Sequence, residues 1–143
     1  MRAYIECRFR STRSNVSRIL IVEDHVKDLS VAEQTARSAG FSDIEARADI
    51  RSAKCYLEKA LGADGYLILL DLDLGQESGY EILRIRYSSP HLARIPVVIW
   101  TQLGHDNYEI CALFNINGYV SKREGPAALR EVLVKLLSEF SQE

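Results

Sequence analysis

Acidic side chains stand directly after two short apolar runs of the sequence. Glu23 and Asp24 follow Ile19–Val22, and Asp71 follows Leu67–Leu70. Carboxylates held close together repel one another, and a hard divalent cation such as Mg²⁺ keeps several of them ionised in one place. If the fold brings these acids together, the sequence predicts a magnesium site.

A hydroxyl group and an ammonium group follow two later runs of the same kind. Thr101 ends the run Val97–Trp100, and Lys122 comes just after Tyr119 and Val120. A lysine pairs with a carboxylate at rest or with an anion brought by a ligand, and a threonine hydroxyl can donate to the same anion. Together with Mg²⁺, these groups are suited to a phosphoryl group.

Each of these residues also has a purely structural interpretation. Acids after a strand commonly cap the next helix, threonine is at home in strands, and a single lysine is usually solvated. That interpretation does not require Glu23, Asp24, Asp71, Thr101 and Lys122 to coincide at strand ends. Their common placement therefore favours one functional site.

The elements that position these residues are strands alternating with amphipathic helices. We expect strands at 19–22, 41–47, 67–70, 97–100 and 119–120, and helices at 26–39, 50–61, 79–86, 107–114 and 126–140. Asp49 can cap the second helix, and Pro126 falls in the first turn of the last. Runs that are apolar on both faces predict a doubly wound α/β fold, a five-stranded parallel sheet with helices on both faces. Ligands of such sheets bind beyond the carboxyl ends of the strands.

Length and composition bound the class of protein. The 143 residues suit one domain, and the net charge of −2 gives no reason to expect nucleic acid or a membrane surface as partner. The longest apolar runs are five residues, whereas a membrane-spanning helix needs about 20.

No secretory signal is evident, so we expect the protein in the cytoplasm, with Cys7, Cys55 and Cys111 as structural thiols. Residues 1–17 carry four arginines and one glutamate, and we expect a disordered basic extension before a domain at 18–143.

Four separated segments resemble the motifs of the receiver domain of bacterial two-component response regulators. They match in order and with suitable spacing, and they are ILIVED (19–24), LILLDLDLGQESGYEIL (67–83), PVVIWT (96–101) and GYVSK (118–122). The resemblance covers the chain from about Arg18 to Phe140. It implies a flavodoxin-like strand order 2-1-3-4-5 and a signalling protein of a phosphorelay rather than an enzyme.

The resemblance also implies a role for each matched residue. Asp71 would accept the phosphoryl group, and Glu23, Asp24 and the backbone carbonyl of Asp73 would help it to hold Mg²⁺. Lys122 would pair with the phosphoryl group, to which Thr101 would donate a hydrogen bond. Tyr119 would be the aromatic switch, turning inward as Thr101 is drawn to the phosphate.

The implied partners are proteins. The phosphoryl donor would be a phosphohistidine of a sensor histidine kinase or of a histidine phosphotransfer protein. The output face would consist of helix four, strand five and helix five. Since little sequence follows Phe140, we expect a stand-alone receiver that signals by protein contacts, without binding nucleic acid. The stand-alone length and the segment between Arg86 and Pro96 also resemble receivers that serve phytochrome-type photoreceptor kinases.

Three positions depart from the family pattern. Gly75 stands where proline is usual, so we expect a looser loop. Gln102 stands where a small residue is usual and is long enough to crowd the phosphoryl pocket or to hydrogen-bond within it. Arg123 replaces the proline that often follows the lysine, which argues against a cis peptide bond there. These departures leave the lifetime of the phosphorylated state open.

Two other functions compete with a phosphorylated receiver. The string LLDLDLG also resembles the D-x-D motif of haloacid dehalogenase-type phosphatases, with Asp71 as nucleophile and Asp73 as general acid. That family needs metal-binding acids after its lysine and leaves Glu23 and Asp24 without a role. The second competitor is a receiver-like scaffold that uses no phosphate, for which Asp71, Thr101 and Lys122 would all be unnecessary.

One stretch is more apolar than a one-faced surface helix requires. It covers Ile110–Phe114, and Val134 also lies off the inner stripe of the last helix. We hypothesise that this side forms a homodimer or docks a partner. Deeper burial of the fourth helix in the monomer is the alternative explanation.

Overall fold

The computed structural model describes residues 4–5, 16–59, 65–102 and 106–141. Within these ranges the chain forms eight strands, five α-helices and one short 3₁₀ turn. In chain order they are β1 (Tyr4–Ile5), β2 (Arg18–Val22), α1 (Val26–Ala39), β3 (Asp43–Arg47), α2 (Ile50–Lys59), β4 (Tyr66–Leu70), β5 (Asp73–Leu74), β6 (Glu77–Ser78), α3 (Tyr80–Ser88), β7 (Val97–Thr101), α4 (Asp106–Ala112), β8 (Gly118–Ser121), η1 (Lys122–Glu124) and α5 (Pro126–Ser141).

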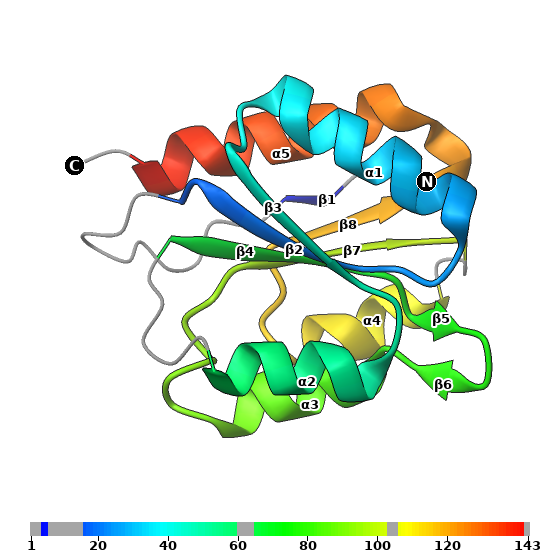
Figure 1. Cartoon of the computed structure of the whole chain (residues 1–143), viewed down its shortest axis with the longest axis vertical. Coiled ribbons are helices and arrows are strands. Elements are labelled where there is room, and N and C mark those ends of the chain that lie inside the picture. Colours follow the sequence, from blue (N-terminus) through cyan, green and yellow to red (C-terminus); the bar gives the residue numbers. More distant parts are fainter. Residues whose placement is uncertain (1–3, 6–15, 60–64, 103–105, 142–143) are drawn as a thin grey trace.

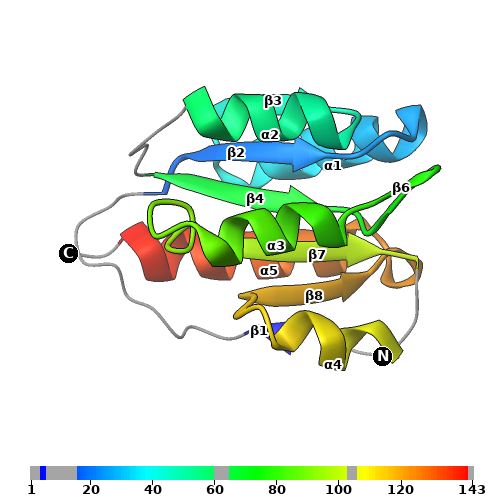
Figure 2. The same ribbon diagram turned by 90° about the horizontal axis from the view of Figure 1, so that it is seen from below.

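A parallel sheet forms the centre of the molecule (Figures 1 and 2). The strand order is β1-β8-β7-β4-β2-β3, and β3, β2, β4, β7 and β8 are parallel to one another. These five strands have the predicted flavodoxin-like order 2-1-3-4-5. The chain goes from β2 to β3 on one side and then crosses to β4 on the other, so the topology switches between β2 and β4. A doubly wound sheet places its ligand site at such a switch point.

Helices cover both faces of the sheet, as predicted. Figure 1 shows α1 and α5 above the sheet and α2, α3 and α4 below it. Side chains of the strands alternate between two apolar cores because successive residues of a strand point to opposite faces. Ile19 and Ile21 pack under α1 and α5, whereas Leu20 and Val22 pack toward α2 and α3. Burial on both faces explains why β2 and β4 are apolar runs.

The helix boundaries follow from signals that the sequence contains. Gly40 ends α1 with φ +119°, and its N–H and that of Phe41 donate to carbonyls of the last turn. Glycine suits this left-handed position because it has no Cβ. Asp49 accepts a hydrogen bond from the Ser52 N–H at 2.8 Å, which confirms it as the cap of α2. Pro126 is the first residue of α5, where its missing N–H has no cost.

Three of the strands, β1, β5 and β6, were not predicted. β5 and β6 form a small antiparallel hairpin beyond the end of β4. β1 pairs antiparallel with β8, with Tyr4 opposite Tyr119, and adds a sixth strand to the edge of the sheet. The expectation of a disordered extension at 1–17 is therefore wrong at Tyr4–Ile5, and Val16 is buried. The rest of that extension lies outside the described residues.

The apolar stretch Ile110–Phe114, which covers the end of α4 and the turn after it, divides between core and surface. Cys111 is fully buried, and Phe114 packs against Tyr87 with the ring centres 5.6 Å apart. Ile110 and Leu113 are exposed, by 48% and 73%. Deeper burial thus explains part of the apolar character of this stretch, and two of its residues are left at the surface.

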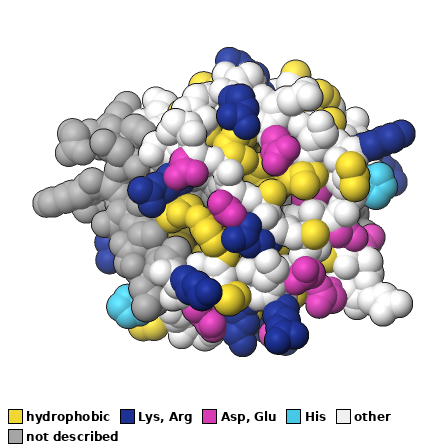
Figure 3. All heavy atoms as spheres, viewed as in Figure 1, with side chains coloured by type: hydrophobic (Ala, Val, Ile, Leu, Met, Phe, Trp, Pro, Cys, Tyr) yellow, Lys and Arg dark blue, Asp and Glu magenta, His cyan; other side chains and the backbone are white. Residues whose placement is uncertain are grey.

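The surface near β3 mixes charges of both signs. In Figure 3, Lys and Arg side chains lie among Asp and Glu side chains, and hydrophobic side chains appear in small groups between them. Arg18 and Asp43 form one such ion pair, with 3.6 Å between the Nε and an Oδ atom. Within the described ranges, every helix is too short or too polar to cross a lipid bilayer.

Candidate functional site

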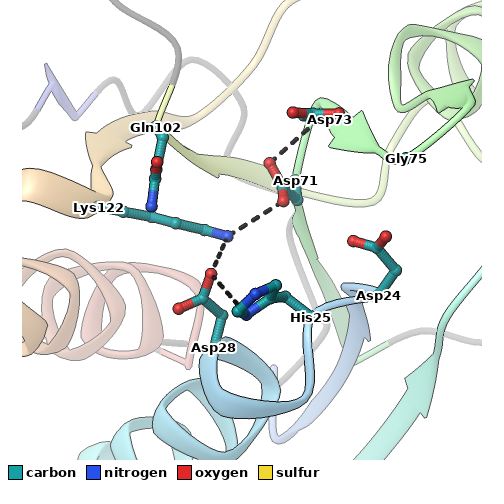
Figure 4. A pocket seen from close by; sticks show the side chains of 8 residues that line it. All are labelled: Asp24, His25, Asp28, Asp71, Asp73, Gly75, Gln102 and Lys122. Carbon is teal, nitrogen blue, oxygen red and sulfur yellow. Dashed lines mark hydrogen bonds and ion pairs between the residues drawn. The ribbon is translucent and has the colours of Figure 1, made fainter.

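A cavity of about 360 Å³ opens at the carboxyl ends of the parallel strands. Figure 4 shows the side chains that line it, which come from the loop after β2, the start of α1, the end of β4 with its hairpin, and the ends of β7 and β8. The lining residues are Asp24, His25, Asp28, Asp71, Asp73, Gly75, Gln102 and Lys122. The cavity therefore lies at the switch point of the sheet.

Three carboxylates form one cluster in and beside the cavity. Glu23, Asp24 and Asp71 each offer an oxygen, and these atoms lie within 4.8 Å of one another. They meet because β2 and β4 are neighbours that pair from Arg18–Tyr66 to Val22–Leu70, so their ends are level. Mg²⁺ binds oxygen ligands at about 2.1 Å, so its opposite ligands lie about 4.2 Å apart. A small contraction of this cluster would accommodate the ion, and hard carboxylate oxygens are suitable ligands for it.

Lys122 crosses the cavity toward these acids. Its Nζ lies 2.8 Å from Glu23 Oε1, 3.1 Å from Asp71 Oδ2 and 2.7 Å from Asp28 Oδ2. The lysine side chain is only 7% exposed, so the three contacts are screened from solvent. An ammonium group has three hydrogens, and here each has a carboxylate partner.

Burial and charge act on the two most enclosed ionisable groups. Burial raises the pKa of Glu23 to about 7, against the lowering effect of the hydrogen bond from Lys122, and the negative charge of Asp71 adds to the increase. Burial alone would lower the pKa of Lys122, but hydrogen bonds to Asp28 and Glu23 and the charge of Asp71 raise it above its ordinary value. Lys122 is therefore a permanent cation among acids.

The segment after Asp71 is shaped by two glycines. A Cβ on Gly79 would lie 2.2 Å from the carbonyl oxygen of Asp71, so only glycine permits this approach of α3 to the end of β4. Gly75 has φ +74° in the turn of the β5–β6 hairpin. Proline, which requires φ near −65°, could not adopt that conformation. The departure from the family pattern at Gly75 thus accompanies an ordered hairpin rather than a looser loop.

The side chain of Asp71 is held from both sides. Asp71 Oδ1 accepts a hydrogen bond from the N–H of Asp73 at 3.2 Å, while Oδ2 faces Lys122. Asp71 is 5% exposed, and the Asp73 side chain is exposed at the cavity mouth. One carboxylate is therefore fixed in orientation at the base of an open cavity.

Two neighbouring residues at the end of β7 differ in whether they reach the cavity. Thr101 is fully buried and is not among the lining residues, whereas Gln102 lines the cavity. Before them, Trp100 is 4% exposed, and its ring centre lies 4.9 Å from Lys122 Nζ. The glutamine is thus placed where the sequence predicted that it could reach a ligand.

Tyr119 lies inward rather than at the surface. It is fully buried, and its ring meets that of Tyr108 edge-on, with centres 5.6 Å apart and planes at 84°. Burial raises the pKa of Tyr119 to about 12. The expected switch residue therefore couples β8 to α4 in this structure.

The last strand ends in a turn without proline. Ser121 Oγ accepts a hydrogen bond from the Arg123 N–H at 3.1 Å and caps the 3₁₀ turn η1 that begins at Lys122. The described residues contain no cis peptide bond, as expected for arginine after the lysine. The turn places Lys122 at the cavity without the proline that is usual in the family.

Asp28 is not among the predicted site residues, although it makes the shortest contact with Lys122. An acid in the first turn of a helix is readily explained by the helix dipole, so nothing distinguished this one. The available signal was its spacing, because Asp28 follows Asp24 by four residues at the beginning of α1. His25 also lines the cavity, and its Nδ1 lies 3.8 Å from Asp28 Oδ2.

Comparison with known proteins places this geometry in one family. A family model of the response regulator receiver domain matches residues 19–134. A receiver domain structure from Rhodospirillum rubrum is 31% identical, with a TM-score of 0.71, covering 87% of this chain and 93% of that one. The phosphorylated cyanobacterial phytochrome response regulator RcpA is 27% identical, with a TM-score of 0.72, covering 87% and 94%. No functionally curated protein is similar enough in sequence to match the chain.

A third similar structure contains a metal ion. It is the receiver domain of the sensor histidine kinase PA1611 from Pseudomonas aeruginosa PAO1, with a magnesium ion coordinated in its active-site cleft. It is 26% identical, with a TM-score of 0.68, covering 86% of this chain and 98% of that one. The cluster of Glu23, Asp24 and Asp71 is an acidic site of the kind that holds a divalent metal.

Proposed function

Because the chain belongs to the family of response regulator receiver domains, which accept a phosphoryl group on an aspartate in two-component signalling, we propose that Asp71 accepts that group here. The donor is a phosphohistidine of a sensor histidine kinase or of a histidine phosphotransfer protein. The chain then acts as a signalling module that works through protein contacts, and the cytoplasm remains its predicted location. The placement of Lys122 Nζ 3.1 Å from Asp71 Oδ2, at the base of an open cavity, is the observation that carries this proposal.

The chemical step is a displacement at phosphorus. One carboxylate oxygen of Asp71 forms a bond to phosphorus as the bond from phosphorus to the imidazole nitrogen of the donor breaks. The electron pair of the broken bond stays on that nitrogen, which leaves a neutral imidazole when the other ring nitrogen carries a proton. The protein contributes orientation and charge, which is the main form of catalysis in phosphoryl transfer.

The residues around Asp71 then have distinct roles. Lys122 offers its ammonium group to the phosphoryl oxygens. Thr101 would turn its hydroxyl toward the same group from the end of β7. Glu23, Asp24, Asp71 and the backbone carbonyl of Asp73 would hold Mg²⁺, which would neutralise charge on the acids and on the phosphoryl oxygens.

The output of the module is proposed to lie around β8. Tyr119 packs against Tyr108 of α4, and Thr101 ends the adjacent strand β7. Drawing Thr101 toward a phosphoryl group would free space beside Tyr119 and change the packing of α4. The readout face consists of α4, β8 and α5. This face has two arrangements, and the charge of the phosphoryl group on Asp71 shifts the equilibrium between them.

Homodimerisation through this same side is part of the proposal. Ile110 is exposed on α4, Leu113 is exposed in the turn directly after it, and Val134 is 37% exposed on α5. The edge of β8 between these helices pairs with β1, so contact would be made by the helices. Sedimentation with and without beryllofluoride tests this, and Leu113→Glu should reduce the dimer. A protein that stays monomeric at high concentration in both states would contradict it.

A phytochrome-like photoreceptor kinase is the donor that we favour. The support is the similarity to RcpA, a phytochrome response regulator. Phosphotransfer from a purified phytochrome kinase should be faster than transfer from an unrelated histidine kinase. Equal rates would remove this assignment and leave the receiver function intact.

One experiment tests the phosphoryl acceptor itself. The protein is incubated with Mg²⁺ and acetyl phosphate, and intact mass is measured over time. We expect one phosphoryl group per chain, lost in Asp71→Asn and retained in Asp43→Asn, which removes an exposed acid on β3. Steady release of phosphate over many turnovers would instead indicate a phosphatase of the D-x-D type. Absence of any adduct would indicate a phosphate-independent scaffold.

A further inference from the structure

Asp28 makes a contact with the proposed phosphoryl-binding lysine that the roles above do not use. It lies in the first turn of α1, and its Oδ2 is 2.7 Å from Lys122 Nζ. The contacts with Glu23 and Asp71 are 2.8 Å and 3.1 Å. Figure 4 shows Lys122 between Asp28 and Asp71, with the charged ends of all three side chains directed toward one another. The hydrogen-bonding capacity of the ammonium group is thus used in full before any phosphoryl group arrives.

The three carboxylates differ in how easily they can release the lysine. The Glu23 side chain is 1% exposed and that of Asp71 is 6% exposed, so neither can exchange the ammonium group for water. The Asp28 side chain is 28% exposed and faces the cavity. Because leaving a buried charge without a partner is costly, Asp28 is the partner that Lys122 can give up at least cost.

We propose that Asp28 is a positioning residue for Lys122, holding it in the unphosphorylated protein and competing with the phosphoryl group for it. The inference rests on the proposed function, since it concerns the same lysine. Formation of the phosphorylated state then includes an exchange in which Lys122 leaves Asp28 for a phosphoryl oxygen and the Asp28 carboxylate becomes hydrated. Asp28 also adds negative charge at the mouth through which an anionic donor must enter. Both effects oppose phosphorylation, so removing this charge should favour the phosphorylated state.

The chain contains its own reporter for this exchange. Trp100 is the single tryptophan, and its ring centre lies 4.9 Å from Lys122 Nζ. Trp100 is 4% exposed, so its fluorescence is governed by neighbouring groups of the protein rather than by solvent. Movement of the ammonium group changes the field at the indole, which makes tryptophan fluorescence a direct measurement of ligand binding beside Lys122.

The test is a titration with beryllofluoride, a phosphoryl mimic, at saturating Mg²⁺. The proteins are the unchanged chain, Asp28→Asn, Asp28→Glu and Glu33→Gln; the last removes one charge from α1 outside the cavity. We expect Asp28→Asn to lower the half-saturating concentration about tenfold, the size expected for one charge-assisted hydrogen bond. Asp28→Glu should restore the original value, and Glu33→Gln should not change it. The rate of phosphorylation by acetyl phosphate should rise in Asp28→Asn in parallel.

The possible outcomes separate this inference from the proposed function. A half-saturating concentration that is the same in Asp28→Asn and Glu33→Gln, or higher in Asp28→Asn, would overturn the role of Asp28 alone. A purely structural role would lower the melting temperature of Asp28→Asn without changing the half-saturating concentration, and this too would overturn it. If the unchanged chain neither binds beryllofluoride nor forms an adduct with acetyl phosphate, the proposed function fails as well.

Discussion

Lys122 and Asp71 are 51 positions apart in the sequence, yet Nζ of one lies 3.1 Å from Oδ2 of the other. Both side chains are almost fully enclosed, with 7% and 6% exposure. The pair forms because β4 and β8 end at the same edge of the sheet, on the two sides of β7. A charged group in such surroundings is stable only while its partners remain, which has a direct consequence for the lysine.

Replacing Lys122 by methionine should destabilise the metal-free protein. The change leaves buried Glu23 and Asp71 and half-buried Asp28 without their common cation. We expect the free energy of unfolding to fall by about 3 to 5 kcal/mol in the presence of EDTA. Mg²⁺ should recover part of this loss, because a divalent cation neutralises the same acids and binds only the folded state. Urea unfolding with EDTA and with Mg²⁺ measures both effects.

The matched control for this variant is Lys54→Met, on the exposed surface of α2. It should change the free energy of unfolding by less than about 0.5 kcal/mol, and Mg²⁺ should stabilise it as it does the unchanged chain. Equal losses in the two variants, or a loss in Lys122→Met that Mg²⁺ does not reduce, would contradict the assignment of Lys122 as the counter-ion of the cluster.

Arg86 should be a major contributor to stability outside the cavity. It is 2% exposed and donates to the carbonyl oxygens of Ile95, Phe114 and Asn115 at 2.7, 2.8 and 3.2 Å. Burial lowers the pKa of Arg86 to about 10. Arg86→Leu would remove the buried donor that these three carbonyls share, at a cost of about 3 kcal/mol or more. The control is Arg84→Leu, because Arg84 is exposed on α3. In denaturant unfolding, Arg84→Leu should lower the free energy of unfolding by less than about 1 kcal/mol, and Arg86→Leu should lower it clearly more.

The parallel core of the fold could be predicted because its signals are local and repeated. Runs such as Leu67–Leu70 between amphipathic segments specify buried strands, and Gly40, Asp49 and Pro126 mark helix ends that the structure confirms. β1 could not be predicted, because two residues have no periodicity and their pairing with β8 depends on the completed sheet. The β5–β6 hairpin was missed for a related reason, since its register depends on the left-handed turn at Gly75.

The site was predictable where its residues follow strands. Glu23, Asp24 and Asp71 are brought together by strand pairing, and Lys122 reaches them from the end of β8. Asp28 was missed because its role depends on a contact with Lys122, 94 residues away in the sequence, and its spacing from Asp24 does not by itself indicate that contact. Arg86 was missed because a polar residue in a helix is usually solvated, whereas this one is enclosed by the loop after α3 and the turn after α4.

Gly79→Ala should damage the site through the backbone of Asp71. The new methyl group would lie 2.2 Å from the Asp71 carbonyl oxygen and 2.9 Å from Leu72 Cα, so the end of β4 or the start of α3 must move. We expect the free energy of unfolding to fall by about 1 to 3 kcal/mol and Mg²⁺ to bind more weakly. Mg²⁺ binding is measured by the fluorescence of Trp100. Gly125→Ala is the control. A Cβ at Gly125 would meet no atom within 4 Å, so the only cost of this substitution is the backbone strain of φ +88°. If Mg²⁺ binds equally to both variants, Gly79 does not position Asp71.

The cysteines should differ sharply in reactivity, and the difference reports on α4. Cys55 is exposed on α2, whereas Cys111 is fully buried and burial raises the pKa of its thiol to about 11. At pH 8 a thiol with that pKa is ionised to about one part in a thousand, and only the thiolate reacts with iodoacetamide. In a Cys7→Ser background, peptide mapping should find Cys55 alkylated quickly and Cys111 only after addition of urea. If phosphorylation loosens the packing between Tyr119 and α4, acetyl phosphate with Mg²⁺ should speed alkylation of Cys111 while leaving that of Cys55 unchanged. An unchanged rate at Cys111 in fully phosphorylated protein would show that α4 does not respond to Asp71.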